Sequence, residues 1–220
     1  MKSNKVLEAI RDLRYLLARG YNRETSLKFV SDKYQLLKLE KMMLYRAVYD
    51  YGKAKIHRAK LIKPEEAKDK EIVIDGYNVI ITLESGLKGK KLIECDDGFV
   101  RDISAIHGKH KITKFTFKAI NLIMKELKEI GPKNTIFVFD SQVSKSGELA
   151  SFIRKKLVET GVKGTAYTVK KADVFSLSFG NIIASSDAVI IEKAYKILDL
   201  AGIILKDRLK SNKIISIKNS

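Results

Sequence analysis

The 220-residue sequence contains very little cysteine and histidine, with one cysteine, Cys95, and three histidines. A single thiol excludes a disulfide within the chain, and so few soft ligands argue against a structural zinc site. We interpret Cys95 as a small buried side chain in preference to a nucleophile.

Long apolar runs are also missing. No run approaches the roughly 20 apolar residues that are needed to cross a bilayer. The N-terminal segment MKSNKVLEAIRDLRYLL carries charges inside its apolar pattern, unlike a signal peptide. We therefore expect a cytoplasmic protein with no membrane partner.

Acidic residues are scarce relative to basic ones. The chain has 43 Lys and Arg but 26 Asp and Glu, for a formal net charge of +17. Such an excess favours partners that carry phosphate. A Lys-rich surface of the kind found in heat-adapted proteins is the alternative, but there Lys and Glu rise together. The imbalance therefore favours contact with nucleic acid.

Residues 1–66 read as a small, basic, all-α domain. Apolar spacings of three and four predict a helix from Val6 to Leu17, a second from about Asn22, and a third from about Leu39 to Ile56. Three short helices are compatible with a helix-turn-helix-like unit. The apolar residues between positions 42 and 49 suit a homodimer interface as readily as a core. A polar linker then leads into a second domain at residues 71–220.

The second domain reads as α/β. Short apolar runs predict strands at residues 72–74, 135–139, 165–169, 181–184 and 214–217, with another short strand suggested at 203–205. Helical segments are expected between them, at about 113–130, 146–160 and 187–200. This alternation predicts a parallel sheet with helices on both faces.

Four aspartates follow these predicted strands: Asp75, Asp140, Asp173 and Asp187. Ligands of parallel sheets bind beyond the carboxyl ends of the strands, so the four carboxylates are expected to converge. Converging carboxylates repel one another, and a divalent cation removes that conflict. Oxygen-only ligation suits Mg²⁺ or Mn²⁺. Capping of a helix N-terminus is the alternative role for Asp75 and Asp187.

The chemistry that fits clustered aspartates in a basic protein is metal-assisted phosphodiester hydrolysis. Asn78 follows the first aspartate in the run DGYN and is a candidate to orient a carboxylate or a metal-bound water. The sequence lacks a G-x-x-x-x-G-K-[ST] loop and a G-x-G-x-x-G turn, which disfavours an NTPase or a dinucleotide enzyme. The predicted catalytic residues are Asp75, Asn78, Asp140, Asp173 and Asp187.

A charged insert at about residues 86–113 is longer than an ordinary loop. Asp97 or Asp102 could add a metal ligand, and His107 and His110 could act as acid or base. An equally good alternative is a surface hairpin with Asp-Gly and His-Gly turns. Together with the basic stretch at residues 53–63, the insert supplies the predicted phosphate contacts Lys53, Lys55, Arg58, Lys60, Lys63, Arg101, Lys109 and Lys111.

The segment DGYNVI resembles the opening of the PIN-like nuclease fold, most closely its NYN branch. FVFDS, KKADVF and IIASSDAVI are similar to later acidic positions of that fold, over roughly residues 71–218. The resemblance implies a PIN-like (Rossmannoid) sheet, with Asp75, Asp140, Asp173 and Asp187 as metal ligands and Asn78 in support. One departure is that Ala188 and Val189 follow the SxD position, where NYN domains often carry another acidic residue.

The whole chain is similar to an archaeal group that joins a basic helical N-terminal part to a PIN-like domain with the segment DDGFVRD. PIN-like domains commonly act on RNA, so the resemblance favours RNA over DNA. The sequence predicts a metal-dependent nuclease whose N-terminal module binds the nucleic acid. Two alternatives stay open: a non-catalytic RNA-binding protein with a degenerate site, and a metal-dependent nucleotide phosphatase.

Overall fold

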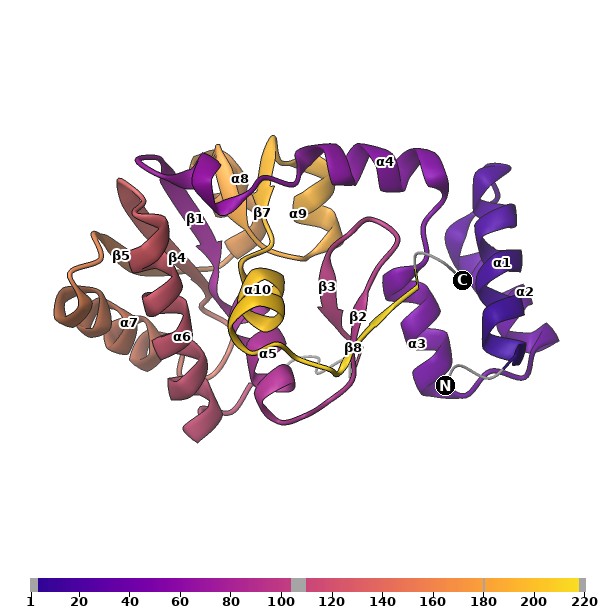
Figure 1. Ribbon diagram of the computed structural model, residues 1–220, viewed down its shortest axis with the longest axis horizontal. Coiled ribbons are helices and arrows are strands. Elements are labelled where there is room, and N and C mark those ends of the chain that lie inside the picture. Colours follow the sequence, from indigo (N-terminus) through magenta and orange to yellow (C-terminus); the bar gives the residue numbers. More distant parts are fainter. Residues whose placement is uncertain (1–3, 104–109, 180, 218–220) are drawn as a thin grey trace. The chain divides into compact units, whose positions relative to one another are not determined.

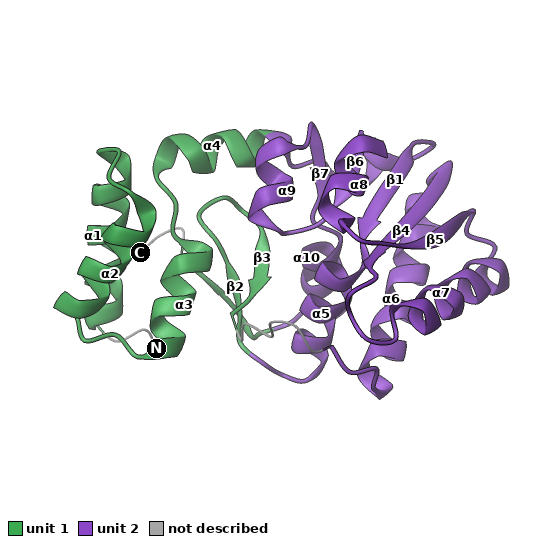
Figure 2. Cartoon of the chain, turned by 180° about the vertical axis from the view of Figure 1, so that it is seen from behind, with its two compact units in different colours: residues 1–59, 91–105, 212–220 green, residues 60–90, 106–211 purple. Residues whose placement is uncertain are grey.

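The structure is a computed structural model that describes residues 4–103, 110–179 and 181–217. The chain divides into two compact units (Figure 2). Unit 1 comprises residues 1–59, 91–105 and 212–220, and unit 2 comprises residues 60–90 and 106–211. The division near residue 60 lies close to the predicted boundary, but two distant segments of the chain join the helical unit.

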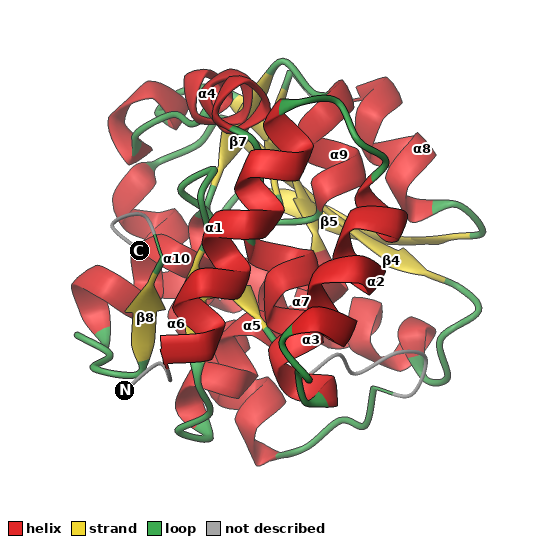
Figure 3. Ribbon diagram, turned by 90° about the vertical axis from the view of Figure 1, so that its right-hand side faces the viewer, coloured by secondary structure: helices red, strands yellow, loops and turns green. Residues whose placement is uncertain are grey.

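Unit 1 begins with three helices that pack against one another, α1 (Asn4–Ala18), α2 (Arg23–Lys33) and α3 (Lys38–Ala47) (Figure 3). The apolar positions of α1 recur at helical spacing and are buried on one face. The side chain of Asn22 begins α2 by accepting hydrogen bonds from the first backbone N–H groups of that helix. The first two predicted helices are therefore confirmed.

The single helix predicted from Leu39 to Ile56 is wrong. Two helices, α3 and α4 (Tyr51–Lys60), are separated by an extended residue at position 48. The backbone N–H of Tyr49 donates to Oδ2 of Asp96 at 3.0 Å, and Oδ1 of Asp50 accepts from the backbone N–H of Lys53 at 2.8 Å. These carboxylates replace the partners that a continuous helix would provide.

A small sheet completes unit 1. Strands β2 (Leu92–Glu94) and β3 (Val100–Asp102) form an antiparallel hairpin, and β8 (Ile214–Ser216) runs parallel to β2. Gly98 has a φ of 90°, which an Asp-Gly turn requires. Ile93, Cys95 and Ile217 join the helices in one apolar core. The hairpin alternative and the burial of Cys95 are thus confirmed, whereas placing residues 214–217 in the main sheet and the hairpin on the surface was wrong.

Unit 2 is built on a five-stranded parallel sheet with the strand order β5-β4-β1-β6-β7 (Figures 1 and 2; β6 is labelled in Figure 2). This confirms an α/β fold with a parallel sheet and a helical N-terminal part. The strands are β1 (Glu71–Asp75), β4 (Asn134–Asp140), β5 (Gly164–Val169), β6 (Ile182–Ala184) and β7 (Lys196–Leu198).

Helices cover both faces of this sheet. On one face, α5 (Gly76–Leu87), α6 (Lys114–Ile130) and α7 (Ser146–Thr160) pack against each other in sequence. On the other, α8 (Ala172–Phe179) covers the apolar side chains of β1 and β4, and α9 (Ala188–Lys193) packs beside it. A 3₁₀ turn (Pro64–Ala67) precedes β1.

The C-terminal part of unit 2 differs from its prediction. The helix expected at residues 187–200 ends at Lys193, and residues 196–198 form β7 instead. The strand suggested at residues 203–205 is helical, within α10 (Leu200–Ile203) and the π-helical segment Ile204–Arg208. Pairing of β7 with β6 overrides the local helical pattern. Within the described ranges, no helix is both long and apolar enough to cross a membrane.

Candidate functional site

Two neighbouring strands of unit 2 end where the order of strands across the sheet reverses. From β1 the chain moves to β4 and β5 on one side, and it then returns to β6 and β7 on the other side of β1. Ligands of open parallel sheets bind beyond the strand ends at this switch point. Asp75 is the last residue of β1, and Ser185, Ser186 and Asp187 follow β6.

Asp75 is partly buried and begins α5 as its N-cap. Oδ2 of Asp75 accepts a hydrogen bond from the hydroxyl of Ser185 at 2.9 Å, and Oδ1 accepts a long one from the backbone N–H of Asn78 at 3.5 Å. Gly76 is required next to it, because a Cβ at that position would overlap the ring of Phe139. The turn from strand to helix therefore holds Asp75 in a fixed position at the sheet edge.

Asn78 links the two strand ends. Its Oδ1 accepts from the backbone N–H of Ser186 at 2.8 Å and from the Ser186 hydroxyl at 3.0 Å. The turn after β1 is thereby joined to the turn after β6. The sequence predicted that Asn78 orients a carboxylate or a metal-bound water, whereas in the structure its side-chain oxygen holds the turn at Ser186.

Asp187 is connected to Asp75 through Ser185. Its backbone N–H donates to the hydroxyl of Ser185 at 3.0 Å, and its Oδ1 accepts from the first N–H groups of α9 at 2.8 and 3.2 Å. Ser185 therefore bonds to both aspartates. Helix capping, the alternative role for Asp75 and Asp187, is observed for both, and it engages a single oxygen of Asp187.

The surroundings of Asp75 disfavour a negative charge on its carboxyl group. Burial raises the pKa of Asp75 to about 6, and the charges of Asp187 and Asp173 add to the rise. The hydrogen bonds from Ser185 and Asn78 oppose it. Because an isolated aspartate titrates near 3.8, the folded protein disfavours the ionised form of this carboxyl group.

Asp140 is the last residue of the neighbouring strand β4, and Asp173 lies in the helix that follows β5. Asp173 is exposed in the first turn of α8, and it influences Asp75 through its charge. Asp140 ends β4, where its Oδ1 accepts from the backbone N–H of Gln142 at 2.8 Å. Burial and the charge of Asp140 raise the pKa of Tyr77 to about 12, which indicates that this ring lies near Asp140.

The donor set of this edge fits a hard divalent cation in its chemistry. Its charged groups are carboxylates, and Asp75 carries a repulsion that a cation would relieve. Over the described ranges, however, no three side chains of His, Cys, Asp or Glu are grouped closely enough to hold a metal ion. Among the residues that the structure describes, the four predicted carboxylates are therefore not gathered into one metal-binding group.

A second polar group lies on the helical face beside Tyr77. Oε1 of the buried Glu84 is 2.8 Å from Nε2 of His110 and accepts from the hydroxyl of Thr116 at 2.6 Å. Burial alone would raise the pKa of Glu84, but hydrogen bonds from His110, Lys88 and Thr116 lower it to about 2. The His110 ring is tilted against the ring of Tyr77, with centroids 5.5 Å apart. His107, the other histidine of the insert, lies outside the described residues.

The structure places the remaining predicted acidic residues of the insert in unit 1. Asp97 is completely buried, where Arg101 donates to both of its oxygens at 2.8 and 2.7 Å, and Nδ1 of His57 lies 3.1 Å away. Asp102 is buried in β3. Because Arg101 donates to both oxygens of Asp97, we correct the assignment of Asp97 from metal ligand to anchor of a buried ion pair. Arg101 is likewise a buried partner of Asp97, so we withdraw it as a phosphate contact.

Two other predicted phosphate contacts also donate to backbone oxygens, and for Arg58 this bond uses one guanidinium nitrogen, Nη1. Arg58 donates to the backbone oxygen of Asp96, and Nζ of Lys60 donates to the carbonyls of Ile191 and Glu192 at the end of α9, at 2.8 and 2.6 Å. The remaining predicted cations are more open to solvent: Lys55, Lys63 and Lys111 are exposed, and Lys53 is partly exposed. Lys109 lies outside the described residues.

The sequence did not single out Ser185, Ser186 or Glu84. Two serines directly after a buried strand, at SSD, are a usable signal, because hydroxyls at a strand end can orient a carboxylate. Glu84 carries no such signal, since a glutamate at a helical position reads as a surface residue. Its importance depends on the partners that the fold brings to it from residues 110 and 116.

Two family models match the chain. One, described as "Domain of unknown function (DUF5616)", matches residues 64–203, and the other, "Protein of unknown function (DUF434)", matches residues 5–60. An uncharacterized protein of Methanocaldococcus jannaschii is 39% identical over 185 residues, which cover 84% of this chain and 88% of that protein. No solved structure matches the chain. The chain therefore belongs to the family described as a domain of unknown function, DUF5616.

Proposed function

We propose that this protein is a metal-dependent nuclease that hydrolyses phosphodiester bonds in RNA, with a PIN-like catalytic domain in unit 2. The main support for the proposal is the hydrogen-bond network that joins the ends of β1 and β6, where the strand order of the sheet reverses. The Ser185 hydroxyl donates to the carboxylate of Asp75 and accepts from the backbone N–H of Asp187. Burial raises the pKa of Asp75 to about 6, and the charge of Asp187 adds to the rise. Carboxylates that are tuned in this way and held at a ligand-binding edge are typical of functional sites.

Each residue of the network has a distinct part in the proposed site. Asp75 and Asp187 would hold a Mg²⁺ or Mn²⁺ ion, supported by Asp140 at the end of β4 and Asp173 in the first turn of α8. Such an ion, when bound, neutralises charge that develops on the phosphate and supplies an activated water. Ser185 fixes the orientation of the Asp75 carboxylate, and Asn78 holds the backbone of Ser186 so that the two strand ends keep their spacing.

RNA is the proposed substrate because the whole chain is strongly basic. A formal net charge of +17 favours a long polyanion over a small nucleotide, since each phosphate contact adds to the affinity. RNA in preference to DNA follows from the resemblance of DGYNVI to PIN-like nucleases. Cleavage by the protein should therefore weaken steeply as salt is added.

The test is to incubate the purified protein with labelled single-stranded and structured RNA, in Mn²⁺ or in EDTA, beside Asp75→Asn. Asp32→Asn is the matched control, because it removes one exposed carboxylate on α2 of unit 1. We expect cleavage that requires both the metal and Asp75 and that survives in the control. Full metal-dependent cleavage by Asp75→Asn would show that the site is wrongly assigned.

Metal binding gives a readout that does not depend on cleavage. Because a metal ligand must be ionised, Mn²⁺ should bind more tightly as the pH rises from 5 to 7 through the raised pKa of Asp75. Electron paramagnetic resonance of free Mn²⁺ measures this directly. Affinity that does not change over that range would contradict a ligand role for Asp75.

A non-catalytic RNA-binding protein is the second candidate. It is favoured by the absence, over the described ranges, of a three-residue metal group, and by the use of Asp75 and Asp187 as helix caps. RNA binding that is sensitive to salt, without cleavage in Mn²⁺, would establish it.

A further inference from the structure

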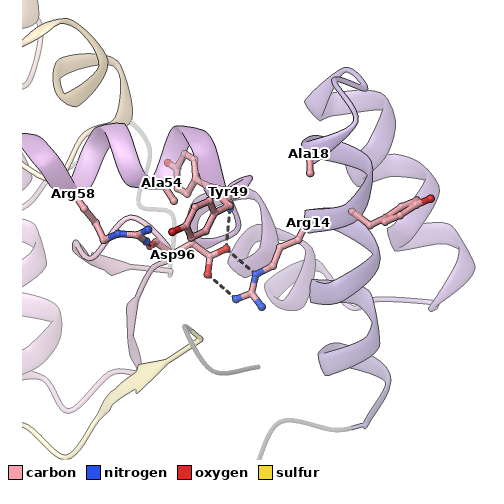
Figure 4. A pocket seen from close by; sticks show the side chains of 8 residues that line it. Arg14, Ala18, Tyr49, Ala54, Arg58 and Asp96 are labelled. Atoms are coloured by element: carbon pink, nitrogen blue, oxygen red, sulfur yellow. Dashed lines mark hydrogen bonds and ion pairs between the residues drawn. The ribbon is translucent and has the colours of Figure 1, made fainter.

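Unit 1 contains a pocket of about 570 Å³ that none of the predicted catalytic residues line (Figure 4). Its walls come from α1, the segment between α3 and α4, α4 itself, and the turn of the β2–β3 hairpin. The volume lies within the range of pockets that hold small ligands or single groups of a larger one. All of its lining residues belong to unit 1.

One wall of the pocket is held rigidly by an ion pair. Arg14 and Asp96 point toward each other, with Nε of Arg14 3.0 Å from Oδ2 and Nη2 2.6 Å from Oδ1 of Asp96 (Figure 4). The backbone N–H of Tyr49 donates to the same carboxylate at 3.0 Å. Arg14 therefore neutralises the acidic group of the pocket, and a bound anion would meet little repulsion from Asp96.

Exposed tyrosines lie at the same pocket. Tyr51 is 75% exposed and Tyr15 is 58% exposed, although both rings are large apolar surfaces. The guanidinium of Arg58 lies 5.8 Å from the centre of the Tyr51 ring, and that of Arg19 lies 4.7 Å from the centre of the Tyr15 ring. Small side chains at Ala18 and Ala54 leave space along the walls.

This combination matches the way in which proteins bind unpaired nucleotides. Bases stack on aromatic rings and on guanidinium planes, while arginines pair with the phosphates. The surrounding chain is complementary in charge, since residues 1–59 contain 14 Lys and Arg against 6 Asp and Glu. An acidic peptide would meet the same charge but has no flat base to match an exposed ring beside an arginine.

We propose that this pocket holds one unpaired nucleotide of an RNA strand, with its base stacked on Tyr51 and its phosphate paired with Arg58. This inference rests on the proposed function, because it assigns a contact with the proposed RNA substrate to unit 1, whereas the aspartates belong to unit 2. It also separates the roles of the two units: unit 1 selects unpaired RNA, and unit 2 carries the carboxylates.

The test measures binding and excludes cleavage. Fluorescence anisotropy in EDTA would compare a short labelled single-stranded RNA with the matching duplex, on full-length protein. The variants are Tyr51→Ala, Tyr51→Phe and Tyr195→Ala, the last removing a tyrosine of unit 2 that is 84% exposed. We expect Tyr51→Ala to weaken single-strand binding about tenfold, as loss of one stacking ring does. Tyr51→Phe, which keeps the ring, and Tyr195→Ala should bind like the wild type.

Several results would overturn the inference: unchanged affinity of Tyr51→Ala, an equal loss for the duplex, an equal loss in Tyr195→Ala, or no RNA binding by the wild type. Displacement of the RNA by a labelled acidic peptide at lower concentration would also overturn it, in favour of a protein partner. If Asp75-dependent cleavage occurs while Tyr51→Ala binds normally, the pocket assignment fails and the nuclease stands. If binding depends on Tyr51 but no cleavage occurs, the pocket stands and the nuclease fails.

Discussion

Replacement of Asp75 by asparagine should make the protein more stable at neutral pH while it removes the proposed activity. The pKa of this carboxyl rises from 3.8 to about 6 on folding. At about 1.4 kcal/mol for each pKa unit, keeping Asp75 ionised in the folded protein costs about 3 kcal/mol. Asparagine has the same shape, carries no charge and is an equally good N-cap.

The increase in the free energy of unfolding of Asp75→Asn should be somewhat smaller than about 3 kcal/mol. Asp75 accepts from both Ser185 and the backbone of Asn78, whereas one amide oxygen would serve both donors less well. A lost hydrogen bond costs about 1 kcal/mol, which leaves a net stabilisation of about 2 kcal/mol. Stabilisation by removal of a functional charge is the usual trade between stability and activity at such sites.

The effect has a definite dependence on pH. The folded protein binds the Asp75 proton more tightly than the unfolded chain does, so this carboxyl lowers the stability of the wild type as the pH rises from 3.8 to 6. The advantage of Asp75→Asn should therefore be nearly complete above pH 7 and small near pH 4. Urea unfolding in EDTA at several pH values, with Asp32→Asn as the exposed control, measures it.

Two outcomes would refute the reasoning. One is an Asp75→Asn variant that is less stable than the wild type at pH 7.5. The other is a stability difference that stays constant from pH 4 to pH 7.5, because an effect of charge must change over the range in which the group titrates. Added Mn²⁺ should narrow the difference by stabilising the wild type alone, since a ligand that binds the folded state stabilises it.

Two further predictions concern packing and buried charge. Gly76→Ala should cost about 1–3 kcal/mol in urea unfolding because the new methyl group overlaps the ring of Phe139, and Phe139→Leu in the same chain should make the combined loss less than additive. Asp97→Asn should cost about 3–5 kcal/mol by thermal or urea unfolding, because Arg101 keeps its charge in the core without a carboxylate partner. A loss below about 1 kcal/mol in Asp97→Asn would mean that water or His57 replaces that partner.

Much of the main sheet could be predicted because each strand is marked by a short apolar run within its own residues. Four of the predicted strands, at residues 72–74, 135–139, 165–169 and 181–184, coincide with β1, β4, β5 and β6. Apolar runs of this length between helical patterns have few other stable arrangements, since they must be buried on both faces. The helices at residues 113–130 and 146–160 follow from apolar periodicity and end at the left-handed glycines 131 and 161.

The elements that were predicted wrongly depend on partners far away in the sequence. The break after α3 requires Asp96, and β7 is a strand because β6 lies beside it. The strand at residues 214–217 was predicted, but it joins the small sheet because it pairs with β2. The same applies to Asp97 in the insert, which reads as a metal ligand until the fold buries it beside His57, a partner 40 residues away in the sequence. No pattern within a short window records such partners.

The candidate site also combines features that the sequence shows locally with contacts that only the fold creates. The sequence by itself determined the chemistry: carboxylates after buried strands, an asparagine three residues beyond the first, and a large excess of positive charge. Only the tertiary structure decided which of them meet. The reversal of strand order places β6 beside β1, so Ser185 bonds to Asp75 and Ser186 to Asn78 across more than a hundred residues of chain. Strand order depends on which long-range pairings bury the most apolar surface, and local composition does not specify those pairings.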